Sequence, residues 1–297
     1  MAGKAPQVGA PEEVVEEVRE RRGIKKGLYI LPSAFTAANI GMGYYSVMAS
    51  LRGFQLLDED LSAATAQFDH AARAIGWAAL FDALDGRIAR MTKTTTEMGI
   101  QLDSLADVLT FGIAPAVLAY AWGYGSSLPD GSQAQKLGWF VSFMFLMCGA
   151  LRLARFNVQA TRPRTLSEGT GKVDKKNFVG LPIPAAAGLI AAFVHFAPSP
   201  IKAYDAGLHG LYSGLAMGVI AALGALMVST IRYSSFKTVG GGRRSRATIF
   251  LFIAAVGMLI WLYSRYTLLA IVSAYVLHGL VLRFLSLFRS RQPNEAR

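Results

Sequence analysis

Long apolar blocks alternate with short polar segments along the whole chain. Each block is about 17–25 residues long, which is enough for a helix to cross the hydrocarbon core of a bilayer. The pattern therefore predicts an all-α, polytopic membrane protein, a bundle of about eight transmembrane helices. The predicted spans are 28–51, 69–90, 101–123, 137–156, 181–200, 209–231, 247–264 and 266–288.

Polar residues mark the two ends of the chain and its longest connection. Residues 1–27 form a polar cytoplasmic segment, in which a short surface helix is predicted to lead into the membrane; its first ten residues fit a disordered tail equally well. Residues 28–290 are predicted to form the transmembrane domain that carries the functional site, and 291–297 a cytoplasmic tail. The connection 157–180 is predicted to lie over the functional site.

The composition supports a membrane location. The chain is 53% hydrophobic and 16% charged, whereas soluble domains carry about 25% charged residues. Its net charge of +11 would suggest nucleic acid in a soluble protein. Here the basic residues lie between apolar blocks, so membrane topology and anionic lipid headgroups explain them without nucleic acid.

The distribution of lysine and arginine predicts the orientation. If the N-terminus is cytoplasmic, one side of the membrane receives only Arg52, Arg73, Lys136, Lys202 and Arg265 between the spans. The other side receives most of the remaining basic residues, as the positive-inside rule requires. We therefore expect an integral protein of an inner or plasma membrane, with both termini in the cytoplasm.

Four aspartates interrupt the second and third apolar blocks. Asp82 and Asp85 are separated by three positions, and Asp103 and Asp107 by four, so each pair shares a helix face. Charge within a membrane is costly and usually faces a functional interior. Four carboxylates that converge would repel one another unless a divalent cation lay between them, which predicts Mg²⁺ or Mn²⁺ and room for two ions.

Small and basic residues follow the aspartates on the same stripes. Gly86 and Ala89 leave the backbone bare, Arg90 offers a planar fork for phosphate oxygens, and Gly99 precedes the second pair. Two other interpretations remain. The aspartates could cap helices or pair with Arg87 and Arg90, or they could line the path of an ion channel or transporter. The absence of a matching set of carboxylates near the other membrane face argues against an ion path.

Two further groups of polar residues lie at span ends. Thr36 and Asn39 are three positions apart in the first span, where they fit either hydrogen bonds between helices or contact with a nucleotide. Arg152 and Arg155 end the fourth span. They fit either positive-inside flanks or bidentate binding of a carboxylate. His195 and His278 are predicted to be isolated, satisfied histidines, and Pro182 and Pro184 to shape a helix entrance.

The aspartates also match a longer pattern, D-x2-D-G-x2-A-R-x8-G-x3-D-x3-D. Its fixed positions are Asp82, Asp85, Gly86, Ala89, Arg90, Gly99, Asp103 and Asp107. In this the chain resembles the CDP-alcohol phosphatidyltransferase family. The resemblance implies that the four aspartates are metal ligands, that Asp107 is also the general base, and that the cytidine nucleotide lies near Thr36 and Asn39.

Three other stretches resemble the phosphatidylserine synthase branch of that family: 151–157, 178–188 and 233–237. The resemblance implies that the hydroxyl of L-serine attacks CDP-diacylglycerol, that CMP leaves, and that the protein is a homodimer. Arg152 and Arg155 are then the candidates for binding the serine carboxylate. Another acceptor, glycerol 3-phosphate or inositol phosphate, or an ether-lipid donor, remains an alternative.

Overall fold

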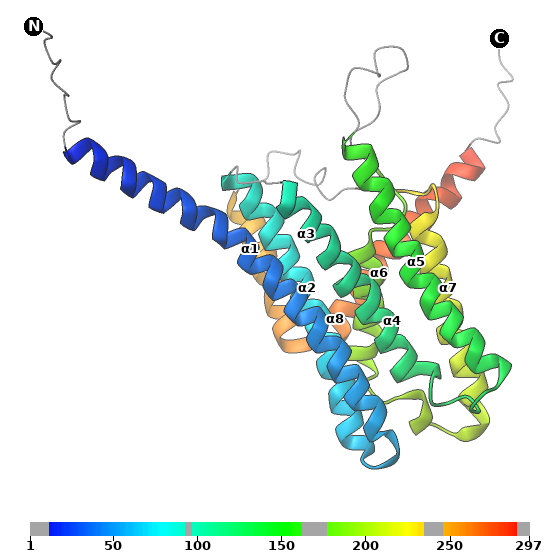
Figure 1. Cartoon of the computed structure of the whole chain (residues 1–297). Helices are drawn as coiled ribbons and strands as arrows, with labels where there is room; N and C mark the ends of the chain where they lie inside the picture. The colour runs from blue at the N-terminus through cyan, green and yellow to red at the C-terminus, as the bar shows by residue number, and fades with distance from the viewer. Residues whose placement is uncertain (1–11, 93–96, 162–176, 235–245, 290–297) are drawn as a thin grey trace, which may run out of the picture.

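The computed structural model describes residues 12–92, 97–161, 177–234 and 246–289, and within them it is a helical bundle with one small sheet (Figure 1). The elements in chain order are α1 (Glu12–Gln55), η1 (Leu56–Asp58), α2 (Leu61–Thr92), α3 (Glu97–Asp107), η2 (Val108–Ile113), α4 (Ala114–Ala119), η3 (Tyr120–Tyr124), α5 (Gln133–Thr161), β1 (Asn177–Val179), α6 (Ile183–Phe196), η5 (Ile201–Ala203), η6 (Ala206–Leu208), α7 (His209–Val228), β2 (Arg232–Ser234) and α8 (Arg246–Arg289).

The predicted helical membrane architecture is confirmed in outline. Among the described residues, five helical segments are long and apolar enough to cross a membrane: Glu97–Tyr124, Gln133–Val158, Ile183–Ala203, Ala206–Val228 and Ala254–Leu282. The helices α1 and α2 are longer than these segments but do not meet the same limit on charge and hydropathy. In α2 the cause is visible in the sequence, because Asp69, Arg73, Asp82 and Asp85 all lie within it.

The first helix is continuous where a boundary was expected. α1 runs without interruption from Glu12 to Gln55, so the predicted surface helix is continuous with the first predicted span and no break separates residue 27 from residue 28. The far N-terminal residues 1–11 and the tail 290–297 lie outside the described residues. α5 likewise continues to Thr161, so the first part of the predicted loop 157–180 is helical and 162–176 is outside the described residues.

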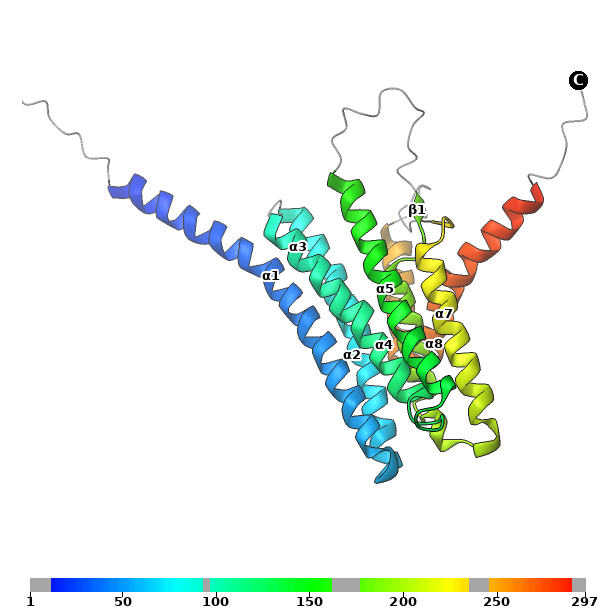
Figure 2. The ribbon, with the colours of Figure 1, turned by 45° about the vertical axis from the view of Figure 1, so that its right-hand side comes forward.

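The bundle is built around α2. α1 and α2 form an antiparallel hairpin that makes the most extensive contact in the structure, α2 also packs against α6, and α5 packs along α7 (Figures 1 and 2). The buried face of α2 repeats at helical spacing through Ala64, Phe68, Ala71, Ile75 and Ala78. Alanine at most of these positions lets neighbouring helix backbones approach closely, as in membrane bundles.

A short antiparallel sheet joins α6 and α7 at one end of the bundle and was not predicted from the sequence. Its register pairs Asn177 with Ser234 and Val179 with Arg232. Gly180 follows with a positive φ of 84°, and a Cβ atom at this position would lie 2.3 Å from the carbonyl oxygen of Met227. Only glycine fits both the backbone conformation and this close approach to α7. The chain then enters α6 with Pro182 as its N-cap residue and Pro184 in its first turn, as expected.

The last two predicted spans lie in α8, which bends sharply. Tyr263 has a non-helical backbone conformation (φ −133°, ψ 47°). Next to it, the Thr267 hydroxyl donates to the carbonyl oxygen of Leu259, eight residues earlier, at 3.2 Å. Eight residues of straight helix would span about 12 Å, so this contact requires a bend. The observed bend lies within two residues of the predicted break between the seventh and eighth spans.

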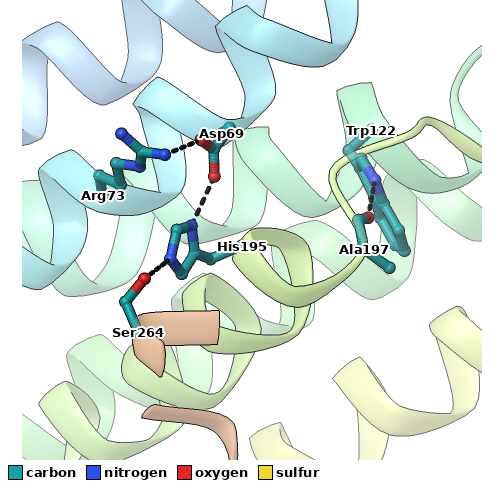
Figure 3. A network of polar contacts seen from close by, with 6 residues as sticks. All are labelled: Asp69, Arg73, Trp122, His195, Ala197 and Ser264. Carbon is teal, nitrogen blue, oxygen red and sulfur yellow. Dashed lines mark hydrogen bonds and ion pairs between the residues drawn. The ribbon is translucent and has the colours of Figure 1, made fainter. Parts of the chain in front are cut away.

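A buried polar chain fixes this bend to the rest of the bundle (Figure 3). The Nδ1 atom of His195 in α6 lies 2.5 Å from an Asp69 carboxylate oxygen in α2, and its Nε2 atom lies 2.9 Å from the hydroxyl of Ser264 in α8. Arg73 pairs with the other Asp69 oxygen at 2.5 Å. His195 is therefore satisfied, as predicted. The expectation that it is isolated is wrong, because Asp69 lies far away in the sequence and is brought in by the packing of α2 against α6.

Candidate functional site

The four motif aspartates lie on two helices at the same end of the bundle. α2 ends at Thr92 and α3 begins at Glu97, at the end where the N-terminal part of α1 and the C-terminal part of α8 also lie (Figures 1 and 2). Asp85 is buried with 5% of its surface exposed, whereas Asp82, Asp103 and Asp107 are half-buried. The spacing predicted that each pair of aspartates shares a helix face, and the burial of all four side chains is consistent with this prediction.

Asp85 is held by a side chain of the first helix. The hydroxyl of Thr36, which is itself buried, donates to Asp85 Oδ2 at 2.5 Å. A hydrogen bond to a carboxylate is stronger than one between neutral groups and fixes the side-chain rotamer. Thr36 thus makes the interhelical bond that the sequence allowed, and it makes this bond to a motif aspartate.

The carboxylate of Asp107 is incompletely satisfied. Its Oδ1 atom is buried and has no hydrogen-bond partner among the described residues. An unpaired buried carboxylate oxygen is costly, since a charged group without a partner loses its full solvation free energy. This cost indicates that the Asp107 oxygen finds its partner in a bound group that is not part of the protein.

The four carboxylates act on one another as a single electrostatic cluster. Each is close enough to the other three for an electrostatic interaction, and none forms a salt bridge with a basic residue in the described part of the chain. The structure therefore does not support pairing of these aspartates with Arg87 or Arg90, both of which are exposed.

This donor set suits a hard divalent cation. All the donors are carboxylate oxygens, which Mg²⁺ and Mn²⁺ prefer, and none of them forms a salt bridge with a described basic side chain. The oxygens do not yet form a closed shell, because no group of three or more His, Cys, Asp or Glu side chains in the described residues meets the spacing of a metal site. The residues fit a divalent ion by chemistry and charge.

The helix changes its winding directly after Asp107. η2 is a π-helical turn, and a second π-helical turn, η3, follows α4. Pro115 lies in the first turn of α4 and has no N–H to bond the carbonyl four residues earlier, which favours such an irregularity. π-helical turns are frequent at functional sites because they redirect side chains. Apolar periodicity alone did not reveal this feature.

Close contact between α1 and η2 brings a second polar residue to the site. A Cβ atom on Gly43 would lie 2.5 Å from the hydroxyl oxygen of Thr110, so glycine is required for the two helices to touch. Thr110 donates to the carbonyl oxygen of Asn39 at 3.3 Å. The Asn39 side chain is fully buried, yet neither its amide nitrogen nor its amide oxygen has a hydrogen-bond partner in the described residues.

The small residues of the motif leave space on the outer turn of α2. A Cβ atom on Gly86 would meet nothing closer than the Arg90 guanidinium at 3.9 Å, so the Arg90 side chain folds back along its own helix over this glycine. Ala89 is half-buried, and both Arg90 and Gly99 are exposed at the end of the bundle. The predicted basic fork and the bare backbone therefore lie next to each other.

The structure gives different surroundings to Arg152 and Arg155, for which the sequence allowed the same roles. Arg155 is exposed, whereas Arg152 is half-buried, with a buried Nε atom that has no hydrogen-bond partner among the described residues. The Arg152 guanidinium also lies within electrostatic range of Asp107. Of these two arginines, Arg152 is the one placed near the aspartate cluster.

A polar contact aligns the helix that carries Arg152 with the helix that carries the aspartates. The Asn157 amide in α5 donates to the hydroxyl of Ser104 in α3 at 2.9 Å. Below it, Ile183 of α6 lies close enough to block a Cβ atom on Gly149 of α5, at 2.5 Å. The two contacts fix the position of α5 at both sides of Arg152.

Comparisons with known proteins show which family the chain resembles. The sequence profile described as CDP-alcohol phosphatidyltransferase matches residues 29–230, a range that includes all four aspartates and Arg152. The chain is 33% identical over 261 residues to the CDP-diacylglycerol–serine O-phosphatidyltransferase of Helicobacter pylori strain J99, covering 86% of this chain and 91% of that protein. It is 33% identical over 213 residues to the archaetidylserine synthase of Methanothermobacter thermautotrophicus, covering 71% and 72% of the two chains.

A third relative, the CDP-diacylglycerol–serine O-phosphatidyltransferase of Methanocaldococcus jannaschii, is 33% identical over 180 residues, or 60% of this chain and 66% of that protein. The profile match covers more than half of the chain, and the Helicobacter pylori relative is matched over nearly its whole length. The chain belongs to the CDP-alcohol phosphatidyltransferase family.

Proposed function

We propose that this chain transfers the phosphatidyl group of CDP-diacylglycerol to the hydroxyl of L-serine, giving phosphatidylserine and CMP. The observation that carries the proposal is the cluster of four mutually repelling carboxylates from α2 and α3, none of which forms a salt bridge with a described basic residue. The three relatives above, two named as serine transferases for CDP-diacylglycerol and one as an archaetidylserine synthase, support the substrate assignment.

Members of this family use divalent metal ions. We assign the ligands of one or two Mg²⁺ or Mn²⁺ ions to Asp82, Asp85, Asp103 and Asp107. When bound, such ions supply positive charge to the diphosphate and to the oxygens that enter and leave in an in-line displacement. The protein's part is to hold the carboxylates in place, which Thr36 does for Asp85.

We assign the general base to Asp107. Its Oδ1 atom has no hydrogen-bond partner among the described residues, so it is available to accept the proton of the serine hydroxyl. The oxygen–phosphorus bond to serine then forms as the bond to the CMP phosphate breaks. General base catalysis typically contributes about 10²–10⁴-fold to the rate, so the positioning of the reactants and the charge around the phosphate have to supply the rest.

The nucleotide is assigned to the polar residues of α1 that lie beside the motif end of α2. The buried Asn39 amide offers one acceptor and two donors without a partner in the described residues, which suits the hydrogen-bonding edge of a cytosine base. The open backbone at Gly86 and Ala89 accommodates the ribose and phosphates. Arg90 and Gly99 complete the outer edge, Arg90 by pairing with phosphate oxygens.

The acceptor is assigned to Arg152, whose guanidinium faces the general base and presents a fork suited to the serine carboxylate. Arg155, which is exposed, keeps the role of a basic flank at the membrane surface. The structure thus favours one of the two arginines that the sequence left open.

We further propose how the chain sits in the membrane. Residues 28–290 form the catalytic unit and cross the bilayer eight times. α8 contributes two of these spans, one on each side of its bend at Tyr263. The distribution of basic residues places the aspartates and both termini in the cytoplasm. By family resemblance, two copies form a homodimer.

An acceptor comparison tests the assignment. Purified full-length protein is given CDP-diacylglycerol with L-serine, glycerol 3-phosphate or inositol phosphate, and CMP release is measured; a parallel series uses an ether-lipid donor. We expect release above the no-acceptor rate only with serine. Release with glycerol 3-phosphate but not with serine would show that the acceptor carries a phosphate. The basic residues between 162 and 176, which could hold such a phosphate, lie outside the described residues.

A further inference from the structure

The half of the bundle opposite the aspartates contains a large apolar cavity. Its volume is about 630 Å³, and its walls are η3 with the end of α4, the second half of α6, the first half of α7 and the part of α8 that follows the bend. These walls belong to four of the segments that are apolar enough to cross a membrane. The connection 201–208 between α6 and α7 closes the outer end of the cavity, away from the start of α3 (Figures 1 and 2).

The walls offer little for a polar ligand to bind. The Trp122 N–H group donates to the carbonyl oxygens of Ala197 and Ser199, at 3.1 and 3.0 Å, so it is already used within the protein. Apart from Trp122, the side chains in the lining are apolar except for three hydroxyl groups, those of Tyr204, Tyr212 and Ser273. A buried water needs two to four polar partners, and an apolar cavity of only about 150 Å³ stays dry and takes up an apolar molecule. This larger cavity therefore suits an apolar occupant.

Aromatic side chains mark the outer end of the cavity. The rings of Tyr204 and Tyr212 meet edge to face with their centroids 5.7 Å apart, and both tyrosines are partly exposed. Trp122 meets Phe193 in the same manner at 5.8 Å. Tyrosine and tryptophan gather where the hydrocarbon core of a membrane meets the lipid headgroups. This end of the cavity therefore lies at headgroup level.

The position of the cavity argues against an occupant from the same chain. The segments 1–11, 93–96, 162–176, 235–245 and 290–297 lie outside the described residues, and each is joined to a helix or strand that ends on the aspartate side of the bundle (Figures 1 and 2). Any of them would have to run the length of the bundle to reach the cavity. The medium next to membrane-crossing segments is lipid hydrocarbon, which is available at every point along them.

We propose that the cavity binds one acyl chain of a phospholipid from the leaflet opposite the aspartates. The ester end of the chain lies level with Tyr204 and Tyr212, and the chain runs inward along α6 from Ala197 to Leu189, over about 12 Å of helix. This lipid is distinct from the proposed donor, whose diphosphate has to reach the aspartates at the other end of the bundle.

The bound chain completes the packing between two helices. α7 packs along α5, whereas α8 packs against α6, and the cavity lies between α7 and the second half of α8. An empty space there would deprive the lining side chains of dispersion contacts. The inference rests on the proposed placement of the bundle in a membrane, and it does not depend on serine as the acceptor.

Tryptophan fluorescence tests the proposal, because Trp122 lines the cavity and is only 6% exposed. The other three tryptophans, Trp77, Trp139 and Trp261, are exposed and are replaced by phenylalanine, so that Trp122 is the single reporter. This full-length variant is placed in phosphatidylcholine vesicles whose acyl chains carry bromine, which quenches tryptophan on contact, either near the ester end or near the methyl end. Vesicles of the unbrominated lipid give the reference fluorescence.

Two variants of this reporter protein fill the cavity from different sides. Ser273→Phe on α8 and Ala216→Phe on α7 each add a ring at a lining position. The matched control is Ala274→Phe, at an exposed residue next to Ser273 that does not line the cavity. Helical circular dichroism and the thermal unfolding midpoint show which variants are folded.

We expect Trp122 to lose most of its fluorescence in the brominated vesicles. The loss should be larger with bromine near the ester end, because Trp122 lies at the outer end of the cavity. The folded filling variants should no longer be quenched, and Ala274→Phe should be quenched like the reporter protein.

Three results would overturn the inference. The first is fluorescence equal to the reference, or quenching that persists in a folded filling variant. The second is stronger quenching by bromine near the methyl end, which would mean that the chain enters from the aspartate side. The third is an unquenched Trp122 together with a dimer that Ser273→Phe converts to a monomer in size-exclusion chromatography, which would mean that a second copy fills the cavity. CMP release is not measured in this experiment, so a failure of the proposed function is a separate result.

Discussion

The buried chain Asp69–His195–Ser264 predicts a large loss of stability when its central member is removed. His195 is 4% exposed and joins α2, α6 and the bend of α8 (Figure 3). In His195→Ala, Asp69 loses one of its two charged or polar partners, Ser264 loses its contact, and a cavity the size of an imidazole ring remains.

The size of the stability loss depends on which partners Asp69 keeps in His195→Ala. Breaking a buried ion pair outright costs about 3–5 kcal/mol. Here Arg73 still pairs with Asp69, and the Arg73 side chain is 52% exposed, so Asp69 keeps a screened partner. A lost hydrogen bond to a charged group costs about 1.5–3 kcal/mol. We therefore expect the free energy of unfolding to fall by about 2–4 kcal/mol, between these two limits.

Thermal unfolding in detergent measures this loss, with His278→Ala as the matched control. His278 lies in α8 and is exposed, so its removal should leave the unfolding midpoint unchanged. A double variant, Asp69→Asn with His195→Ala, should be destabilised by clearly less than the sum of the single effects, because the two residues share one contact. Equal midpoints for His195→Ala and His278→Ala would refute the reasoning.

Two further substitutions follow from contacts in the structure. Gly180→Ala forces a Cβ atom to within 2.3 Å of the Met227 carbonyl oxygen at a positive φ, so the unfolding free energy should fall by more than about 2 kcal/mol; Gly218→Ala, a helical glycine with open space, is the control and should not destabilise. Thr36→Val removes the donor to Asp85 and keeps the shape, so kcat/KM for CMP release should fall about tenfold with an unchanged melting curve; wild-type turnover would contradict that role.

The sequence predicted the parts of this protein that local patterns encode. Apolar blocks give helices of membrane length, and the spacing of the motif aspartates puts them on shared faces, because both are properties of neighbouring residues. An interruption near Tyr263 was also anticipated, although as a boundary between two spans, 247–264 and 266–288, and the structure has a bend within one helix there. Each of these features depends only on residues within a single helix.

Contacts between distant residues were not predictable in the same way. His195 and Asp69 are separated by 126 positions, and nothing in either segment identifies the other. Arg152 and Arg155 end the same apolar block, and only the packing of α5 against α3 and η2 decides which one faces Asp107. The π-helical turn after Asp107 depends on Pro115 and on neighbouring helices, and the apolar pattern is compatible with ordinary α-helix there.

The central claim is that the four motif aspartates together hold a divalent ion, and Mn²⁺ binding tests it most directly. Electron paramagnetic resonance counts free Mn²⁺ during titration of the purified protein, with CDP-diacylglycerol present. The wild type and Asp58→Asn, a variant of an exposed aspartate at the opposite end of the bundle, should bind the ion equally well, whereas Asp103→Asn should bind it at least about tenfold more weakly. Equal Mn²⁺ affinity in Asp103→Asn and the wild type would contradict the account.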